Sequence, residues 1–245
     1  MTDPSPSTPP VLELEDVHAG YLQFKALFGV SFAIREAEAV ALIGPNGAGK
    51  TTVARVASGL VAPTAGRVLV NGEDFSGKPA DTFARAGIAH APEGRSVFAT
   101  LTVEENLTLG FRRRFGRHGV NAALEKAYDL FPRLGERRGQ GAGSLSGGEQ
   151  RMLTLAAVLV LEPKVLLADE LSLGLAPIIT DDLYYVLERI LSSGTALLLV
   201  EQHVDRALAL ANEVIVLERG IVRHRGHPDR DEILRSVFGA SEVVS

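Results

Sequence analysis

The stretch Gly44-Pro45-Asn46-Gly47-Ala48-Gly49-Lys50-Thr51-Thr52 decides the fold of this chain. It fits the pattern G-x-x-x-x-G-K-[S/T], in which backbone N–H groups converge on phosphate oxygens, the lysine reaches the β- and γ-phosphates, and the hydroxyl ligates Mg²⁺. The alternative is a glycine-rich turn with a solvated lysine. With this composition, an accidental match is expected in roughly half a percent of chains, so the stretch predicts a nucleotide-binding loop.

The residues around the loop supply the strand and the helix that such a loop requires. Val40-Ala41-Leu42-Ile43 form a short continuous apolar run, typical of a strand buried on both faces, and a helical pattern continues to about Leu60. Further along the chain, apolar runs alternate with helical patterns; the predicted strands are 165–168, 196–200 and 213–217, and the predicted helices are 148–161, 177–191 and 204–210. This alternation predicts an α/β fold with parallel strands and a nucleotide-sized crevice at their carboxyl ends.

Two other regions complete the predicted domain of residues 11–240. Partly alternating apolar residues at 11–14 and 29–34 predict a small antiparallel layer, with Tyr21 in the turn region between them. Residues 93–143 form a predicted helical insertion, with helical patterns at 103–109 and 122–131 and with Thr102 and Glu105 at capping-box spacing. The proline-rich residues 1–10 are expected to be a disordered tail.

Composition excludes several classes of function. The 25 Lys and Arg residues against 30 Asp and Glu residues give a net charge of −5, which argues against a dedicated nucleic-acid binder. Cysteine is absent, which excludes disulfides and a thiol nucleophile. No apolar run approaches the ~20 residues needed to cross a bilayer. The basic cluster at 112–117 is interpreted as a solvated helix end, and His90, His118, His224 and His227 as surface or structural residues.

A second acidic anchor for Mg²⁺ is expected on a strand next to the loop. Val165-Leu166-Leu167-Ala168-Asp169 offers an apolar strand that ends in a carboxylate, so Asp169 is the predicted magnesium ligand. Glu170 follows at once and is placed to orient or deprotonate a water that attacks the γ-phosphate. Alone, such an Asp-Glu pair indicates a solvated strand end; together with the phosphate loop it indicates catalysis.

The hexapeptide Leu145-Ser146-Gly147-Gly148-Glu149-Gln150 has two compatible interpretations. Ser146 and Glu149 stand at capping-box spacing before an apolar helix. A serine hydroxyl and glycine N–H groups at a helix N-terminus also form an anion site of the kind that binds a γ-phosphate.

Together these motifs resemble the ATP-binding subunits of ABC transporters, from about Val11 to Phe238. The resemblance implies a P-loop NTPase fold with an ABC-type ATPase core, an antiparallel β layer and a helical signature subdomain. It also implies that ATP is sandwiched between two such domains, the phosphate loop of one facing the signature residues 146–149 of the other. Tyr21 then corresponds to the aromatic residue that stacks on adenine; the alternative is a partly buried sheet aromatic.

The segments 91–95, 102–107, 172–177 and 200–202 are similar to the branched-chain amino-acid transport ATPases, and most to the second ATPase subunit of that system. In this resemblance Glu93 stands where a glutamine usually contacts Mg²⁺ or water. The switch position, usually histidine, aligns with Gln202, although a shift of one residue would place His203 there. Leu171 replaces the usual proline after the catalytic glutamate, which predicts a looser loop.

The family resemblance predicts a transport ATPase that binds ATP and Mg²⁺ and works at the cytoplasmic face of the inner membrane. Its expected partners are two membrane permease subunits that dock near residues 93–97, a sister ATPase subunit or a second copy of itself, and indirectly a substrate-binding protein. The alternatives are a urea or amide importer, an ATPase of DNA repair, chromosome handling or translation, and a regulatory ATPase of cell division. One copy of each motif and no sustained heptads disfavour the nucleic-acid class.

Overall fold

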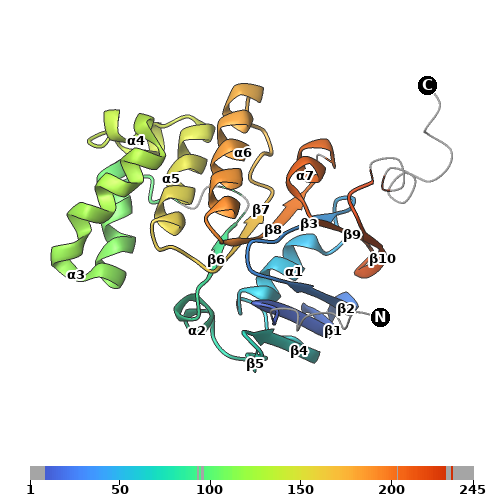
Figure 1. The fold of residues 1–245 in the computed structure, drawn as a ribbon. Coiled ribbons are helices and arrows are strands. Elements are labelled where there is room, and N and C mark those ends of the chain that lie inside the picture. The colour runs from blue at the N-terminus through green and yellow to red at the C-terminus, as the bar shows by residue number, and fades with distance from the viewer. Residues whose placement is uncertain (1–8, 93, 95–96, 203, 230–232, 234–245) are drawn as a thin grey trace, which may run out of the picture. The chain divides into compact units, whose positions relative to one another are not determined.

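A computed structural model describes residues 9–92, 94, 97–202, 204–229 and 233 of the chain (Figure 1). It contains two compact units. Unit 1 comprises Met1–His90, Lys164–Glu170 and Ile190–Ser245, and unit 2 comprises Ala91–Pro163 and Leu171–Arg189. The described part holds no helix that is both long and apolar enough to cross a membrane.

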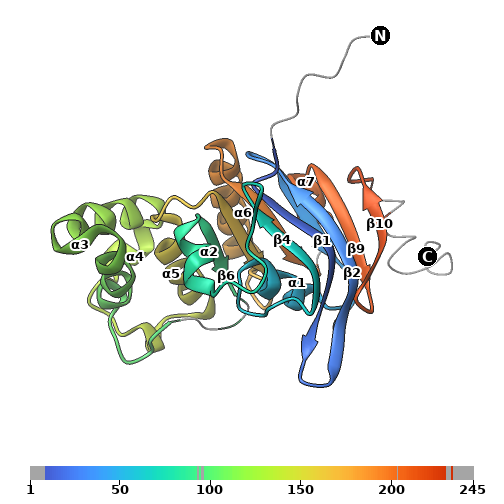
Figure 2. The same cartoon turned by 90° about the horizontal axis from the view of Figure 1, so that it is seen from below.

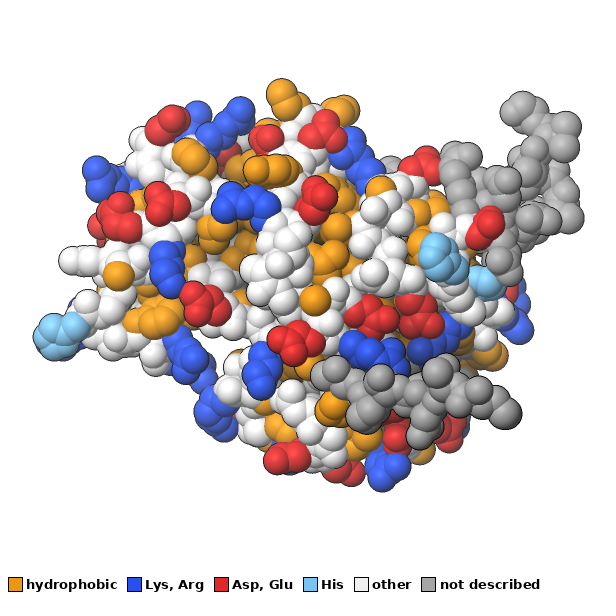
Figure 3. All heavy atoms as spheres, in the orientation of Figure 1, with side chains coloured by type: hydrophobic (Ala, Val, Ile, Leu, Met, Phe, Trp, Pro, Cys, Tyr) orange, Lys and Arg blue, Asp and Glu red, His pale blue; other side chains and the backbone are white. Residues whose placement is uncertain are grey.

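On the face drawn in Figure 3, acidic and basic side chains are interspersed, in keeping with the small net charge.

Unit 1 is built on two sheets. The antiparallel sheet has the order β2-β1-β4-β5, with β1 Leu12–Tyr21, β2 Phe24–Ile34, β4 Ala65–Val70 and β5 Glu73–Asp74. The mixed sheet has the order β10-β9-β3-β8-β7-β6, with β3 Ala39–Ile43, β6 Ile88–Ala91, β7 Val165–Asp169, β8 Ala196–Glu201, β9 Glu213–Glu218 and β10 Ile221–Gly226. The helices of this unit are α1 Lys50–Ala57, α2 Ala80–Arg85 and α7 Val204–Leu210.

Strand β3 lies inside the mixed sheet and brings the loop after it to the centre of unit 1. It pairs in parallel with β8 and β9, and all five of its residues are buried. Val40 and Leu42 join a core shared with α1 and the antiparallel sheet, whereas Ala41 and Ile43 join a second core with α7. The predicted strand buried on both faces is therefore confirmed, and Figure 2 shows α1 beside the antiparallel strands.

Unit 2 is helical. It contains α3 Val103–Leu130, α4 Pro132–Glu136, a 3-10 turn at Ala142–Ser144, α5 Gly147–Leu159 and most of α6 Pro177–Ser192. Helix α3 contacts both α4 and α5. Capping boxes are present at Thr102 with Glu105 and at Ser146 with Glu149, as the sequence predicts. These side chains satisfy N–H groups that a helix start leaves without intrahelical partners.

Three details differ from the sequence predictions. The two helical patterns of the insertion are joined in α3, which is interrupted at Gly116 by a non-helical conformation (φ 65°, ψ −174°). Tyr21 is the last residue of β1, and the turn consists of residues 22–23. Helices α2 and α4 and strands β5 and β10 were not predicted. Strand β10 has no fully buried residue and therefore lacks an apolar pattern.

Candidate functional site

The phosphate loop runs from the end of β3 to the start of α1, and its glycines are required by geometry. A Cβ on Gly44 would lie 2.1 Å from the carbonyl oxygen of Leu217. Gly49 is the N-cap of α1 with a φ of 105°, a conformation that favours glycine. No side chain caps this helix, and its first turn carries no acidic residue. The N-terminus of α1 therefore presents free N–H donors and a positive dipole end to the loop.

Lys50 is the only charged side chain in this first turn, and it is 4% exposed. Its Nζ donates to the carbonyl oxygens of Gly44 (2.9 Å) and Pro45 (3.3 Å). The same Nζ lies 3.3 Å from Oε1 of Glu170. The ammonium group is thus held at the mouth of the loop, beside the carboxylate that the sequence predicts to act on water.

Thr51 and Asp169 meet at the ends of α1 and β7. The hydroxyl of Thr51 donates to Oδ1 of Asp169 at 3.3 Å, and Asp169 is fully buried. Oδ2 of Asp169 has no hydrogen-bond partner, which is costly for a buried carboxylate oxygen. A hydroxyl and a carboxylate with a free oxygen suit a hard cation such as Mg²⁺, which takes its other oxygen ligands from phosphate and water.

Glu170 lies directly after β7, and its backbone has a strained conformation with a φ of 48°. Its N–H donates to the carbonyl oxygen of Val200 at 2.8 Å, which fixes the residue against β8. Oε2 accepts a hydrogen bond from Nε2 of Gln202 at 2.9 Å. The structure therefore brings Gln202 to the carboxylate, while His203, the alternative switch residue, lies outside the described residues.

Tyr21 lies at the hairpin end of the antiparallel sheet and is 39% exposed. Its hydroxyl accepts a hydrogen bond from Nη1 of Arg55 at 3.2 Å, and the guanidinium carbon lies 5.9 Å from the ring centroid. Arg55 belongs to the last turn of α1. A cation over a ring face is attractive, so Arg55 limits the orientations of Tyr21. The sequence patterns gave no role to Arg55.

His90 is a second residue that the sequence analysis did not place at the site. Its side chain is 8% exposed, which excludes the interpretation as a surface residue, and its Nε2 lies 3.9 Å from Oδ2 of Asp169. Nδ1 lies 3.2 Å from the hydroxyl of Ser58, at the end of α1. No spacing rule links His90 to Asp169, because the contact depends on the position of β6 in the sheet.

The signature residues begin α5 in unit 2. Ser146 is the N-cap, and its hydroxyl accepts from the N–H of Glu149 at 3.3 Å. A Cβ on Gly148 would lie 2.7 Å from Ile179 of α6, whereas one on Gly147 would meet nothing within 4 Å. Gly148 therefore permits close packing of α5 on α6, and Gly147 leaves the helix start open to an approaching group.

The acidic residue of this helix start is ionised at neutral pH. Burial by itself would raise the pKa of Glu149, but hydrogen bonds from the N–H and hydroxyl of Ser146, followed by the charges of Arg137 and Arg133, outweigh it and lower the pKa. Oε1 of Glu149 lies 2.8 Å from Nε of Arg137. The two helix starts thus differ: the first turn of α1 carries a lysine and no acidic residue, whereas the first turn of α5 carries a glutamate.

Two further predictions concern Glu93 and Leu171. Glu93 lies outside the described residues, so its expected contact with Mg²⁺ stays a prediction. Leu171, which replaces the proline of the family pattern, is 1% exposed. At this position a buried leucine contributes packing, whereas a proline would contribute a fixed φ. The expected loosening of the loop stays a prediction as well.

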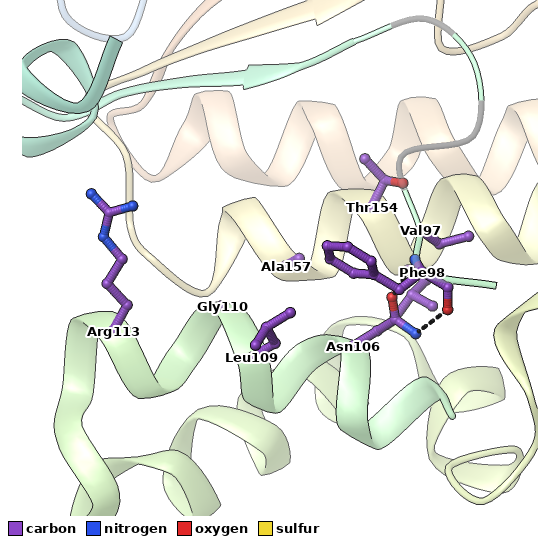
Figure 4. Close-up of a pocket in the computed structure, with 9 residues that line it drawn as sticks. Val97, Phe98, Asn106, Leu109, Gly110, Arg113, Thr154 and Ala157 are labelled. Carbon is purple, nitrogen blue, oxygen red and sulfur yellow. Dashed lines mark hydrogen bonds between the residues drawn. The ribbon is translucent and has the colours of Figure 1, made fainter. Parts of the chain in front are cut away.

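A mostly apolar pocket of about 390 Å³ lies within unit 2, between the segment after residue 96 and helices α3 and α5 (Figure 4). Nδ2 of Asn106 donates to the carbonyl oxygen of Phe98 at 3.1 Å and shapes one end, and Arg113 stands at the other. Phe98 and Leu109 are 59% and 53% exposed. The lining residues are Val97, Phe98, Asn106, Leu109, Gly110, Arg113, Leu153, Thr154 and Ala157.

Comparison with known proteins agrees with this geometry. Residues 27–172 match the family model described as ABC transporter. The chain is similar to the high-affinity branched-chain amino acid transport ATP-binding protein BraG of Pseudomonas aeruginosa, with 43% identity over 87% of this chain and 92% of that protein. It is also 36% identical to the probable branched-chain amino acid transport ATP-binding protein LivF of Archaeoglobus fulgidus, over 88% and 92% of the two chains.

Solved structures of the same kind share the fold. A nucleotide-free ATP-binding cassette from an ABC transporter superposes with a TM-score of 0.83 at 25% identity, over 97% of this chain and 98% of that one. The ADP conformation of another ATP-binding cassette superposes with a TM-score of 0.79 at 26% identity, over 93% and 94%. The predicted fold class is confirmed.

Proposed function

This chain belongs to the ABC transporter family, and from that premise we propose that it is the ATP-binding and ATP-hydrolysing subunit of an importer for branched-chain amino acids. The observation that carries the proposal is the meeting of four side chains in unit 1. Lys50 and Thr51 start α1, Asp169 ends β7, and Glu170 follows it. The Lys50 ammonium lies 3.3 Å from the Glu170 carboxylate, and the Thr51 hydroxyl lies 3.3 Å from the Asp169 carboxylate. This set supplies what phosphoryl transfer to water needs.

In this proposal the loop holds the nucleotide phosphates through backbone N–H groups of Gly44, Asn46, Gly47, Ala48, Gly49 and Thr52. Pro45 belongs to the same loop but has no N–H to donate. Lys50 binds the β- and γ-phosphates. Thr51 and Asp169, together with Glu93, would hold Mg²⁺. When bound, the ion would neutralise charge on the phosphate oxygens. Tyr21 stacks on adenine, with its hydroxyl fixed by Arg55 at 3.2 Å.

Glu170 orients and deprotonates the attacking water. Its Oε2 already accepts from Gln202, whose amide can donate to a γ-phosphate oxygen but cannot carry a proton. Proton transfer is therefore assigned to the carboxylate alone. We expect phosphate binding and activation of water to be coupled, because Lys50, the proposed phosphate ligand, lies 3.3 Å from Glu170.

The second half of the proposed ATP site comes from another ATPase subunit, either a sister chain or a second copy of this one. Ser146, Gly147, Gly148 and Glu149 would face the γ-phosphate held by the other subunit's loop. The open space around Gly147 supports this assignment, because an approaching phosphate meets no side chain there.

The permease subunits are proposed to dock in the pocket of unit 2. Exposed Phe98 and Leu109 offer apolar contact to a permease segment, and Arg113 offers a positive charge at one end. Val97 lines this pocket and belongs to the segment where the sequence predicts docking. The chain would then sit peripherally at the cytoplasmic face of the inner membrane, with a substrate-binding protein delivering cargo on the other side.

Hydrolysis is tested with Glu170→Gln in the full chain. We expect ATP affinity to stay within about threefold, turnover to fall about 100- to 1,000-fold, and an ATP-bound dimer to accumulate, because the amide cannot accept the proton of the attacking water. Steady-state ATPase assays and light scattering measure this, with the exposed Glu188→Gln as the matched control. Unchanged turnover would remove Glu170 from the role of base.

Cargo is tested in proteoliposomes that contain this subunit with its permeases and binding protein. We expect ATP-dependent uptake of leucine, isoleucine or valine that is lost with Glu170→Gln. Uptake of urea or short amides in place of these amino acids would favour the alternative importer class. ATP hydrolysis stimulated by nucleic acid, without uptake of any of these solutes, would contradict the transport assignment.

A further inference from the structure

Arg137 ties the start of α5 to the end of α4, and neither the motifs nor the family assignment gives it a role. Its Nε lies 2.8 Å from Oε1 of Glu149. The other oxygen of that carboxylate, Oε2, accepts hydrogen bonds from the N–H and the hydroxyl of Ser146, both at 2.8 Å. One carboxylate therefore links the guanidinium of Arg137 to the serine that begins the signature helix.

Arg137 is itself held in place by the segment before that serine. Its Nη1 donates to Oε1 of Gln140 at 3.1 Å. Nε2 of Gln140 donates to the hydroxyl of Ser144 at 3.0 Å, and this hydroxyl donates to the carbonyl oxygen of Gly141 at 2.8 Å. Because the guanidinium fork is planar, contacts on Nε and Nη1 fix its orientation toward Glu149.

Glu149 creates an electrostatic problem for an anion site. It lies in the first turn of α5, its side chain is 11% exposed, and it is ionised at neutral pH. A second anion that approaches the same helix start is repelled by this carboxylate. The guanidinium at 2.8 Å cancels the charge locally, so the pair is neutral and the dipole of α5 can act on the anion.

The carboxylate also competes for the hydroxyl of Ser146. A serine hydroxyl has one hydrogen to donate, and here it donates to Oε2 of Glu149. To donate to a phosphate oxygen, the hydroxyl must leave Glu149. A carboxylate that is bound to a guanidinium through its other oxygen is a weaker acceptor than a bare one, so Arg137 makes this exchange easier.

We propose that Arg137 is a positioning residue of the ATPase: it neutralises Glu149, so that the start of α5 accepts the γ-phosphate of the facing subunit and the hydroxyl of Ser146 is released to it. The inference rests on the proposed function, since it needs Ser146 to face a phosphate. Arg137 acts through Glu149 and does not itself touch the nucleotide.

The test is a double-mutant cycle in the full chain, with KM for ATP, kcat and melting temperature measured for each protein. The variants of the cycle are Arg137→Ala, Glu149→Gln and the combination of both. Arg137→Lys tests whether a conservative replacement restores function. Arg138→Ala is the matched control because Arg138 is an exposed neighbour of equal charge. We expect Arg137→Ala to raise KM about tenfold, the effect of one uncompensated charge near the ligand. Arg137→Lys should recover most of this loss, and Arg138→Ala should behave as the wild type.

The decisive result is the effect of Arg137→Ala when Glu149 is already neutral. We expect KM to change less than about twofold between Glu149→Gln and the double variant, because no charge is left to cancel. A tenfold penalty that persists in the Glu149→Gln background, or a wild-type KM in Arg137→Ala, would overturn the inference while the proposed function stands. A wild-type chain that neither binds nor hydrolyses ATP would overturn both.

Discussion

The starts of α1 and α5 are the same kind of element with opposite arrangements of charge. Helix α1 begins after Gly49 without a side-chain cap, with Lys50 as its first residue and no acidic group in its first turn. Helix α5 begins with a capping box from Ser146, and its first turn contains Glu149. The start of α1 is therefore open and positive, whereas that of α5 is satisfied by its own side chains.

This difference separates two tasks of the proposed ATPase. The N–H groups of an uncapped helix start bind a polyphosphate without first giving up a side-chain cap, so α1 should provide most of the affinity for ATP. A capped helix start must exchange a hydrogen bond before it can bind, so α5 should contribute little to the ATP affinity of a single subunit and should act on the steady-state constants of the dimer. Variants at α1 should accordingly change ATP binding by the monomer, whereas variants at α5 should change the KM or the rate of ATP hydrolysis.

The largest effect is expected for Lys50→Ala. This change removes an ammonium that contacts the loop carbonyls and Glu170, and it leaves Glu170 buried without its cation. We expect the affinity for ATP to fall at least about 100-fold, or about 2.7 kcal/mol. Isothermal titration calorimetry measures the change, with the exposed Lys164→Ala as the control. ATP affinity equal to that of the wild type would contradict the phosphate-loop assignment.

An intermediate effect is expected for Ser146→Ala, and on a different constant. The hydroxyl of Ser146 is a hydrogen-bond donor in the start of α5, and its loss removes one charge-assisted bond to the γ-phosphate in the dimer. We expect the rate of ATP hydrolysis to fall about tenfold. The exposed Ser192→Ala, at the end of α6, is the matched control for loss of a hydroxyl elsewhere in the chain. A loss of the same size in both variants would show that the rate does not depend on a phosphate contact of Ser146.

The smallest effect is expected in the pH dependence of stability, and it concerns the ion pair of Glu149, in the first turn of α5, with Arg137. Folding lowers the pKa of Glu149 below its ordinary value of 4.5. The ionised carboxylate therefore stabilises the folded state above about pH 4.5, and this stabilisation is lost as the pH falls through the lowered pKa. The wild type should melt about 2 °C above Glu149→Gln at pH 7. This difference in melting temperature should shrink below pH 4.5, which differential scanning calorimetry can measure. A difference that stays constant with pH would contradict the assignment of a negative charge to Glu149.

The two helix starts also show what the sequence could predict. Both lie in local patterns, a glycine-rich loop after an apolar strand and a Ser-x-x-Glu box before an apolar helix, and both form as predicted. The meeting of Thr51 with Asp169 followed from the parallel order of the strands. Local sequence rules and strand order are sufficient to place the core of the site.

The supporting side chains could not be predicted in the same way. Arg55 reaches Tyr21 from α1, His90 reaches Asp169 from β6, and Arg137 reaches Glu149 from the end of α4. Each contact joins separate elements and depends on their packing, for which the sequence has no periodic signal. The exposed strand β10 was missed for a related reason, because its pattern reflects pairing with β9 and not burial.

The most direct test of the account is ATP binding by dilute, monomeric protein, compared between the two helix starts. Equilibrium titration with Mg²⁺ and ATP would be done in parallel on the wild type, Lys50→Ala and Ser146→Ala. The account predicts that Lys50→Ala loses at least about 100-fold in affinity, while Ser146→Ala stays within about twofold of the wild type. Equal losses in both variants, or a greater loss in Ser146→Ala, would contradict the division of tasks between α1 and α5.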